Sequence, residues 1–476
     1  MNYPIWDIPF LGAGLVVAII AIIHVLISHL AIGGGAFLFI AEVWSNRTEH
    51  GDRIRDWLHK YATWFLVYTT VFGAVTGVGI WFSIQLANAE ATSLLIHQFV
   101  FAWAIEWVAF LGELTVLYFY FYGWKKNSRS LQVFLAGAYF VISWMSLFII
   151  NGILSFMLTP GDWTILNKDI FLGFFNPGFF PSLLIRTLAM FMIGGLFGII
   201  VAARVTDDSD FKERIISFSS KWIIPAAVAA PFLLLWYWST LPENTIEIFK
   251  SGVTGVMGGK LEALTRYFWL AIIAAGLILA GIAFILIRPR AASLTGAIAL
   301  FLIAQFGVLG AEFFREMARK PYVIYGVLYS NGLWQSDADN PEYMKKPYLD
   351  QAKWHPDVEE LSSEHGEWVF RLQCAACHTR DGYRAISTRT KDWTGEFGFK
   401  WLETLDQQGV MPKFQGSAED RAALSAYLVS LHGDTITAGD ILAMVAEAET
   451  GDTTSVTDSS AVMDTSVVTG EMEESK

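Results

Sequence analysis

The sequence predicts an all-α protein, in which a polytopic transmembrane helix bundle of about eight spans precedes a small all-α domain. Three observations support this fold class. Hydrophobic residues make up 54% of the 476 residues and charged residues only 16%, which is too apolar for a water-soluble core. The apolar residues occur in runs of about 20 or more, long enough to cross a bilayer as helices. After residue 322 the composition turns abruptly polar.

Eight runs are long enough to be membrane spans. The expected spans are 11–44, 61–87, 97–124, 131–158, 181–203, 220–240, 264–287 and 292–318. A signal peptide begins with positive charge and has a short apolar core, whereas the first ten residues hold no Lys or Arg and the apolar run that follows is much longer. We therefore expect the first span to remain as a helix.

Loop charges predict the orientation of the bundle. Thirteen Lys and Arg residues follow spans one, three, five and seven, whereas the alternate loops up to the last span carry only four. Because cytoplasmic loops are enriched in positive charge, the first set is expected in the cytoplasm. The N-terminus and everything after the eighth span are therefore expected on the outer side of a bacterial inner (cytoplasmic) membrane.

We divide the chain into a membrane domain at 1–330, a polar linker at 331–359, a soluble domain at 360–433 and an acidic tail at 434–476. The tail holds ten acidic residues and one Lys with few aromatics, so we expect it to be disordered, although its pattern allows a short helix near 438–449. It accounts for most of the net charge of −12, and nucleic acid is not an expected partner.

The only two cysteines form a motif in the soluble domain. Cys374, Cys377 and His378 read C-x-x-C-H, in which two thiols form thioethers to a haem c and the adjacent imidazole ligates its iron. A zinc or redox C-x-x-C would need a second cysteine pair or a thioredoxin-like βαβ unit, and the sequence has neither. Covalent haem attachment takes place on the outer face of the bacterial membrane, which agrees with the orientation predicted from the loop charges.

A sixth iron ligand is expected farther along the chain. Met411, in the segment GVMPKFQG, follows His378 by 33 residues and precedes a helix-like segment. A thioether ligand raises the reduction potential of a haem, which suits an electron carrier. This arrangement resembles small monohaem cytochromes c. The alternative is that Met411 is an ordinary loop methionine.

Three histidines fall in the membrane part: His24 and His29 on the first span, and His97 at the outer start of the third. Neutral imidazole is a good iron ligand, so each is a candidate for a b-type haem. His24 and His29 are five residues apart and point in different directions on a helix, so they cannot serve one iron. The alternative is that one of them only bonds a neighbouring carbonyl.

Acidic residues also lie within the spans. Glu106 and Glu113, on the third span, are seven residues apart and therefore on one stripe, which favours a proton relay or haem ligation over packing. The eighth span ends in GAEFFREMARKPYVIYG, with acidic and basic residues at spacings of three and four. This ending is either a surface salt-bridge ladder or brings Glu316 to a haem iron and Arg319 to a haem propionate.

Residues 1–330 resemble the haem-bearing large subunit of cytochrome bd-type quinol oxidases. The likeness rests on IHVLISHLAIGGGAFLFIAE, GAVTG, AIEWVAFLGELTVLYFYFYGW, NGILSFMLTP and EMARKPYVIYG, in that order. By resemblance, His24 falls on the first-helix haem ligand and Glu113 on the second Glu of the third helix. Glu316 and Arg319 fall on the Glu and Arg of the family's E-x-G-R-Q-P-W, and the His and this Glu serve the haems where oxygen is reduced.

The sequence also departs from that family. The two Glu of the third helix are one residue closer here, so Glu106 matches only through a widened turn. Arg186 stands where the family has the His ligand of its quinol-side, low-spin haem; Arg cannot ligate iron, and we expect it to bind a haem propionate or a carboxylate instead. His29 is an extra histidine. The quinol-binding loop is shortened to 241–263, and the haem c domain replaces the ninth helix.

These departures predict a change of electron donor: quinol is replaced by an outer-face haem c. Electrons are expected to pass between haem c and haems b, or b and d, in the bundle, with Glu106 and Glu113 as catalytic proton carriers and oxygen as the acceptor. The alternative is a non-catalytic electron-transfer subunit that links a periplasmic redox partner to quinone or another carrier; a second axial ligand from His29 favours it. By resemblance, a second membrane subunit and other cytochrome subunits are expected partners.

Overall fold

The computed structural model describes residues 5–205, 208–253, 262–355 and 357–451. Within these residues, eight helices are long and apolar enough to cross a membrane, which confirms the all-α class and the number of spans. They are α1 (Ala13–Ser45), α2 to α3 (Gly51–Ala87), α5 (Val100–Tyr122), α6 (Arg129–Phe156), α8 (Phe179–Ala203), α9 to α10 (Ser209–Ser239), α12 (Glu262–Ile287) and α13 (Leu294–Ala318).

Two spans are composite. The second consists of α2 (Gly51–Val67), the π-helical turn η1 (Tyr68–Phe72) and α3 (Gly73–Ala87). The sixth consists of α9 (Ser209–Ser220), the 3₁₀ turn η2 (Lys221–Ile223) and α10 (Ile224–Ser239), whose first turn contains a proline. Local changes of helix type such as these re-aim the side chains beyond them.

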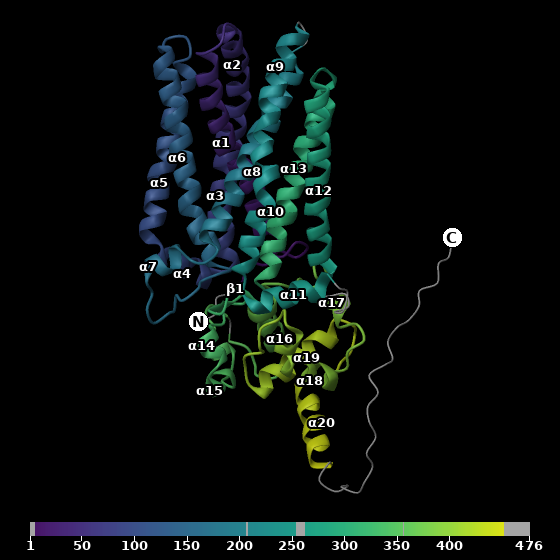
Figure 1. Ribbon diagram of the computed structural model, residues 1–476. Helices are drawn as coiled ribbons and strands as arrows, with labels where there is room; N and C mark the ends of the chain where they lie inside the picture. Colours follow the sequence, from purple (N-terminus) through teal and green to yellow (C-terminus); the bar gives the residue numbers. More distant parts are fainter. Residues whose placement is uncertain (1–4, 206–207, 254–261, 356, 452–476) are drawn as a thin grey trace, which may run out of the picture.

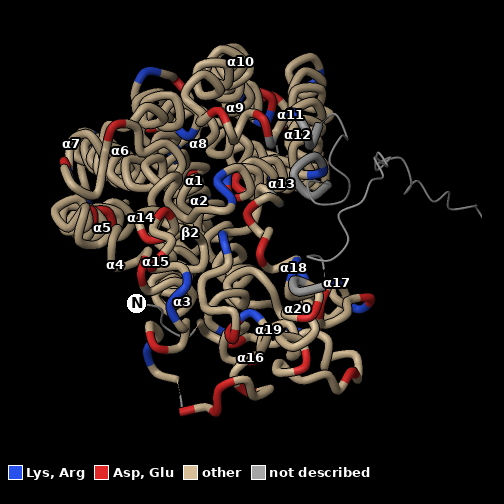
Figure 2. The backbone as a smooth tube through the Cα atoms, turned by 90° about the horizontal axis from the view of Figure 1, so that it is seen from below, with Lys and Arg blue, Asp and Glu red and all other residues tan. Residues whose placement is uncertain are grey.

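The helices run side by side, and their loops alternate between the two ends (Figure 1). The four loops rich in Lys and Arg lie at one end, and the N-terminal segment and the C-terminal lobe lie at the other (Figure 1). Short helices cover the lobe's end: α4 (Ala89–Gln98), α7 (Ile170–Phe174) and α11 (Glu243–Val253), while η3 (Pro289–Ala291) lies in a loop at the opposite end. Viewed from the lobe's end, most of the length of the membrane helices is tan, with few Lys, Arg, Asp or Glu residues (Figure 2).

Helix α1 packs against α8 with no room for side chains between the two backbones. A Cβ at Gly33 would lie 1.8 Å from the carbonyl oxygen of Met190, and one at Gly194 would lie 2.4 Å from the carbonyl oxygen of Gly33. Small residues allow such close approach in membrane helix pairs. The sequence IGGG therefore makes α1 a central helix, which also contacts α3 and α6.

Residues 322–451 form the lobe. A small antiparallel hairpin, β1 (Tyr322–Ile324) with β2 (Leu328–Tyr329), lies over the end of the bundle, where the Tyr325 amide donates to the Met157 carbonyl at 2.9 Å. The helical elements that follow are α14 (Gln335–Ala338), α15 (Pro341–Met344), η4 (Leu349–Gln351), α16 (Ser363–Val369), η5 (Phe370–Cys374), α17 (Ile386–Arg389), α18 (Gly395–Glu403), η6 (Leu405–Gln408), α19 (Ala418–Ser430) and α20 (Ala438–Gly451).

The apolar core of the lobe extends beyond the range 360–433. Tyr348, placed in the linker by its polar surroundings, is fully buried and packs with Leu424. The acidic segment from residue 434 begins with a helix, α20, at the place where the sequence pattern allowed a short helix near 438–449. Ala438 and Ile441, in the first turn of α20, are buried and pack with residues of α18 and α19. This apolar contact attaches the helix to the lobe. Residues 452–476 lie outside the described residues.

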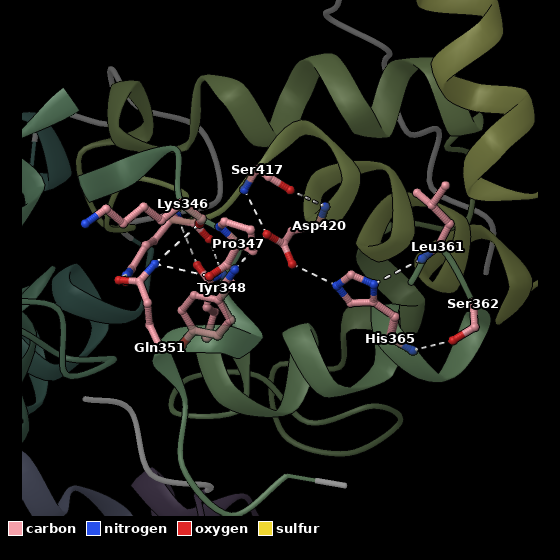
Figure 3. A network of polar contacts seen from close by, with 11 residues as sticks. Lys346, Pro347, Tyr348, Gln351, Leu361, Ser362, His365, Ser417 and Asp420 are labelled. Carbon is pink, nitrogen blue, oxygen red and sulfur yellow. Dashed lines mark hydrogen bonds and ion pairs between the residues drawn. The ribbon is translucent and has the colours of Figure 1, made fainter. Parts of the chain in front are cut away.

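A buried polar network joins three segments of the lobe (Figure 3). The Asp420 carboxylate on α19 accepts hydrogen bonds from the backbone amides of Tyr348 and Ser417, both at 2.8 Å, and pairs with His365 Nε2 at 2.7 Å. His365 Nδ1 accepts from the Leu361 amide at 3.2 Å, so the proton of the neutral ring is on Nε2. The network fixes α16, which leads directly into the C-x-x-C-H motif.

Candidate haem sites

The C-x-x-C-H motif forms a tight turn at the end of η5. The amides of Cys377 and His378 both donate to the Cys374 carbonyl, at 3.0 and 2.9 Å. His378 Nδ1 donates to the Arg384 carbonyl at 3.0 Å, so the lone pair of the neutral ring is on Nε2. Burial lowers the pKa of His378 to about 4, which keeps the imidazole in its neutral, ligating form at neutral pH.

The cysteines do not suit the redox or zinc alternatives. Both are free thiols, and burial raises the pKa of Cys374 to about 12, whereas a disulfide-exchanging cysteine needs a lowered pKa. Within the described part of the chain, no group of three or more His, Cys, Asp or Glu residues is placed to hold a metal ion. The donor set of two thiols and one oriented imidazole fits covalent haem.

Met411 lies in a loop that is tied to this motif. Gln373, the residue before Cys374, donates from Nε2 to the Gln415 carbonyl at 2.5 Å and accepts from the Gln415 amide at 3.2 Å. Both Gln373 and Gln415 are buried. These two hydrogen bonds hold the segment 409–416 beside the cysteine turn, on the same lobe.

In the bundle, His24 on α1 is oriented by α3. His24 Nδ1 lies 3.0 Å from Thr76 Oγ1, and the Thr76 hydroxyl itself donates to the Phe72 carbonyl at 2.7 Å. Because the hydroxyl proton is used there, Thr76 accepts the Nδ1 proton, and the lone pair is on His24 Nε2. A hydrogen bond from the second ring nitrogen is the usual support of a metal-bound histidine.

The other two histidines differ in how far they are buried. His29 is buried in α1 and donates from Nδ1 to the Val25 carbonyl at 2.7 Å. His97 is exposed and lies on α4, a separate short helix before the third span, where Nδ1 bonds the Ser93 carbonyl at 2.8 Å. It lines a surface cavity of about 410 Å³ with Lys168 and others. The third span itself begins at residue 100.

Arg186 pairs with a carboxylate. It reaches from α8 to Glu312 on α13 at 2.7 Å, and Arg315 contacts the same carboxylate at 3.0 Å. The side chains of Arg186 and Glu312 are 11% and 13% exposed, so this is a buried ionic cluster and not a surface ladder. His29 lies within electrostatic range of both Arg186 and Glu312.

The end of α13 nearest the lobe carries a second ionic group. Arg319 pairs with Glu316, and Lys320 lies 3.5 Å from the same carboxylate. Arg319 also donates to the Val323 carbonyl at 2.8 Å. Among the described residues, Arg319 Nε and Arg315 Nη1 are buried donors without a hydrogen-bond partner. Unpaired buried donors beside a carboxylate fit the acidic propionates of a haem.

Glu106 and Glu113 share one neighbour. Ser146 on α6 donates to Glu106 at 3.2 Å and also lies within hydrogen-bonding reach of Glu113. The two carboxyls on α5 are thus joined through one hydroxyl. Among the described residues, the polar contacts of His24, Glu106 and Glu316 are made with different partners, Thr76, Ser146 and Arg319, so these side chains lie in separate local arrangements.

Sequence reasoning missed several of these residues. Thr76, which orients His24, and Ser146, which joins the two glutamates, are small hydroxyl residues whose role depends on packing between helices. It also missed Glu42, which is fully buried at the basic end of α1, accepts a hydrogen bond from Tyr120 at 3.0 Å and lies 3.7 Å from Arg55. A carboxylate inside a span was the signal available for Glu42.

Residues 13–236, covering the first six spans, match the model of the family described as cytochrome bd terminal oxidase subunit I. The fold resembles the bd oxidase from Geobacillus thermodenitrificans with a TM-score of 0.54 and 13% sequence identity, over 67% of this chain and 90% of that chain. None of the curated proteins compared with the chain matches it. The chain is a multi-pass membrane protein similar to cytochrome bd oxidase subunit I. The family match implies haem-based respiratory electron transfer with haems of the b or d type.

Proposed function

We propose that the protein moves electrons between a covalent haem c in its lobe and haems b, or b and d, in its helix bundle, and that it reduces oxygen as a cytochrome c-linked terminal oxidase. The observation that carries the proposal is shared by the two regions. In both His378 and His24, Nδ1 is held by a hydrogen bond that leaves the Nε2 lone pair to ligate iron. Haem iron supplies the one-electron and oxygen chemistry.

Each candidate residue of the lobe has a different role in binding haem c. Cys374 and Cys377 would form the two thioether bonds to haem c, and His378 and Met411 would hold its iron. The hydrogen bonds between Gln373 and Gln415 support the assignment of Met411, because they hold its loop beside the motif. Burial raises the pKa of the Cys374 thiol to about 12, so this thiol stays protonated and is a poor group for disulfide exchange.

In the bundle, His24 and Glu316 would hold haem iron, and Arg319 would bind a propionate through its buried Nε, which has no hydrogen-bond partner among the described residues. Arg186 does not ligate iron. Its positive charge is neutralised by Glu312, so the position at which the quinol-linked family has a haem-ligating His carries an ion pair instead. This substitution supports a donor other than quinol.

Protons reach the oxygen site along α5. Glu113, Ser146 and Glu106 form a short chain of groups that can accept and release protons, as proton relays inside membranes do. The basic loops face the cytoplasm, and the lobe faces the periplasm, where haem c is attached and a soluble redox partner has access. Subunit I proteins typically pair with a second membrane subunit, and we expect such a partner here.

A second candidate function is a non-catalytic electron-transfer subunit that links a periplasmic partner to quinone or another carrier. His29 favours it, because this buried imidazole also directs Nδ1 to a carbonyl and so leaves Nε2 as a ligand. If His29, or His97 at the surface, completed the axial ligation of a b haem, that iron would be low-spin and closed to oxygen.

Carbon monoxide separates the two functions. The proposal expects the reduced protein to bind carbon monoxide and to consume oxygen with a reduced c-type donor, and expects a pyridine haemochrome assay to find one c haem together with b or d haems. A reduced spectrum unchanged by carbon monoxide, with full haem content, would establish the electron-transfer function instead. Purified protein with thioether-linked haem alone would refute both.

A further inference from the structure

The surface that joins the lobe to the bundle is formed by the haem c motif itself. A Cβ at Gly14, in the first turn of α1, would lie 3.0 Å from the carbonyl oxygen of Ala376, which stands between the two cysteines. A Cβ at Gly12 would lie 3.0 Å from the Thr379 methyl group, next to His378. The start of α1 therefore touches the turn that is expected to hold the haem.

A second contact lies a few residues farther on. The Tyr383 amide donates to the Phe10 carbonyl at 2.7 Å. Gly382 lies so close to Phe10 that an added Cβ would be 2.2 Å from the Phe10 carbonyl oxygen. No side chain larger than hydrogen fits at residue 382 without moving the loop, so this loop of the lobe lies directly against the segment that leads into α1.

A third contact reaches the end of α13. Arg384, whose carbonyl orients His378, donates from Nη2 to Met317 Sδ at 3.2 Å. Val410, next to Met411, packs against the same methionine. Met317 is 8% exposed and is adjacent in the chain to Glu316. Arg384, whose carbonyl orients His378, and Val410, the neighbour of Met411, thus contact the same buried side chain.

We propose that electrons cross between the lobe and the bundle at the contact of Arg384 and Val410 with Met317, and that Glu316 lies at the bundle end of this path. The proposal rests on the proposed function. One electron leaves the c-type haem, whose iron is oxidised from Fe(II) to Fe(III), and reduces a bundle haem iron from Fe(III) to Fe(II), with no bond made or broken and no proton required.

The proposed path from His378 to Glu316 needs few steps through bonds and contacts. It runs from His378 through one hydrogen bond to Arg384, through one contact to Met317, and through the backbone to Glu316. Met317 and Arg384 are positioning residues, since they hold the two sites together without ligating iron. Because the lobe is held at three places, transfer does not need the lobe to dissociate and dock again.

The test uses the purified full chain with its haems. Laser-flash reduction would follow the c-type absorbance as it decays and the bundle haem absorbance as it rises, at a rate independent of protein concentration. Met317→Ala opens the contact and should slow this transfer several-fold, whereas Met317→Leu, which keeps the volume, should largely restore it. Redox titration should find both haem potentials unchanged. Met444→Ala, on exposed α20, is the matched control.

A second variant gives a readout that does not depend on haem, the rate of hydrogen exchange at the Tyr383 amide. Gly382→Ala should displace the loop from Phe10 and break the hydrogen bond of this amide, so its exchange should become faster. Electron transfer in the same variant should become slower. Gly439→Ala, at an exposed position on α20, is its control. Normal transfer in both Met317→Ala and Gly382→Ala would overturn this proposal while leaving the proposed function intact. Failure of the wild-type protein to carry both kinds of haem would instead refute the proposed function.

Discussion

The lobe and the bundle hold their expected haem ligands in opposite ways. In the lobe, two thiols and an imidazole come from five consecutive residues, and a single turn at the end of η5 orients them. In the bundle, the candidate residues come from separate helices, with His24 on α1, its partner Thr76 on α3, and Glu316 on α13. The lobe site therefore depends on local sequence, whereas the bundle site depends on how the helices pack.

The largest effect should come from the local site. Cys374→Ala removes one thioether and should abolish stable covalent haem, because the motif needs both thiols. Haem staining of a denaturing gel should show no haem on the chain, while the bundle haems remain in the spectrum of the native membrane fraction. Loss of the bundle haems as well would contradict the independence of the two sites.

A comparable loss is expected in the bundle when His24 is removed. His24→Ala should eliminate one b- or d-type haem, carbon monoxide binding and oxygen consumption, with the c haem unchanged. A pyridine haemochrome assay measures each haem type. If every haem spectrum and the oxygen rate stayed as in the wild type, His24 would not be a ligand.

Substitution of Thr76, which orients His24, should have a smaller effect than removal of His24 itself. Thr76→Val keeps the shape of the side chain but cannot accept the Nδ1 proton of His24. Loss of such a supporting hydrogen bond typically weakens metal binding or activity by about 10- to 100-fold. Thr63→Val, an exposed threonine on the same span, is the matched control. Equal haem retention in Thr76→Val and Thr63→Val would show that α3 does not orient the ligand.

The same contrast explains how much was predictable from the sequence. Eight apolar runs predicted eight membrane helices, because the length needed to cross a bilayer is a property of each segment alone. The C-x-x-C-H motif is equally local. The pairing of Arg186 with Glu312, however, joins residues more than a hundred positions apart, and only helix packing brings them together.

Boundaries were the less predictable part of the fold. Tyr348 lies among polar residues, and its burial depends on Leu424 far along the chain. Acidic composition predicted a disordered tail after residue 434 with a short helix allowed near 438–449, and Ala438 and Ile441 provide the apolar contacts that join this helix to the lobe. His97 was assigned to the third span because its sequence is continuous with it, whereas the chain breaks the helix at Phe99. Each difference reflects a tertiary contact or a local break that composition does not reveal.

Substitution of Arg186 tests whether the stability of the bundle depends on its buried ion pairs. Arg186→Leu should destabilise the bundle by about 3–5 kcal/mol, because it leaves the Glu312 carboxylate buried with less compensation. The double variant Arg186→Leu with Glu312→Leu should recover much of that loss. Thermal unfolding of the detergent-solubilised protein measures both. A single variant as stable as the wild type would mean that Arg315 alone neutralises Glu312.

The smallest effect should come from the network that supports the lobe's motif. His365→Leu leaves the Leu361 amide and one Asp420 oxygen without their partner, and should cost about 1–3 kcal/mol in lobe stability. Haem attachment should persist, because the cysteine turn is held by its own backbone hydrogen bonds. The temperature at which the c-type spectrum loses its native form measures the change. His432→Leu, which loses one contact with Thr390 at 3.2 Å, should shift that temperature less. If His365→Leu instead prevented haem attachment, the lobe site would depend on long-range packing as the bundle site does.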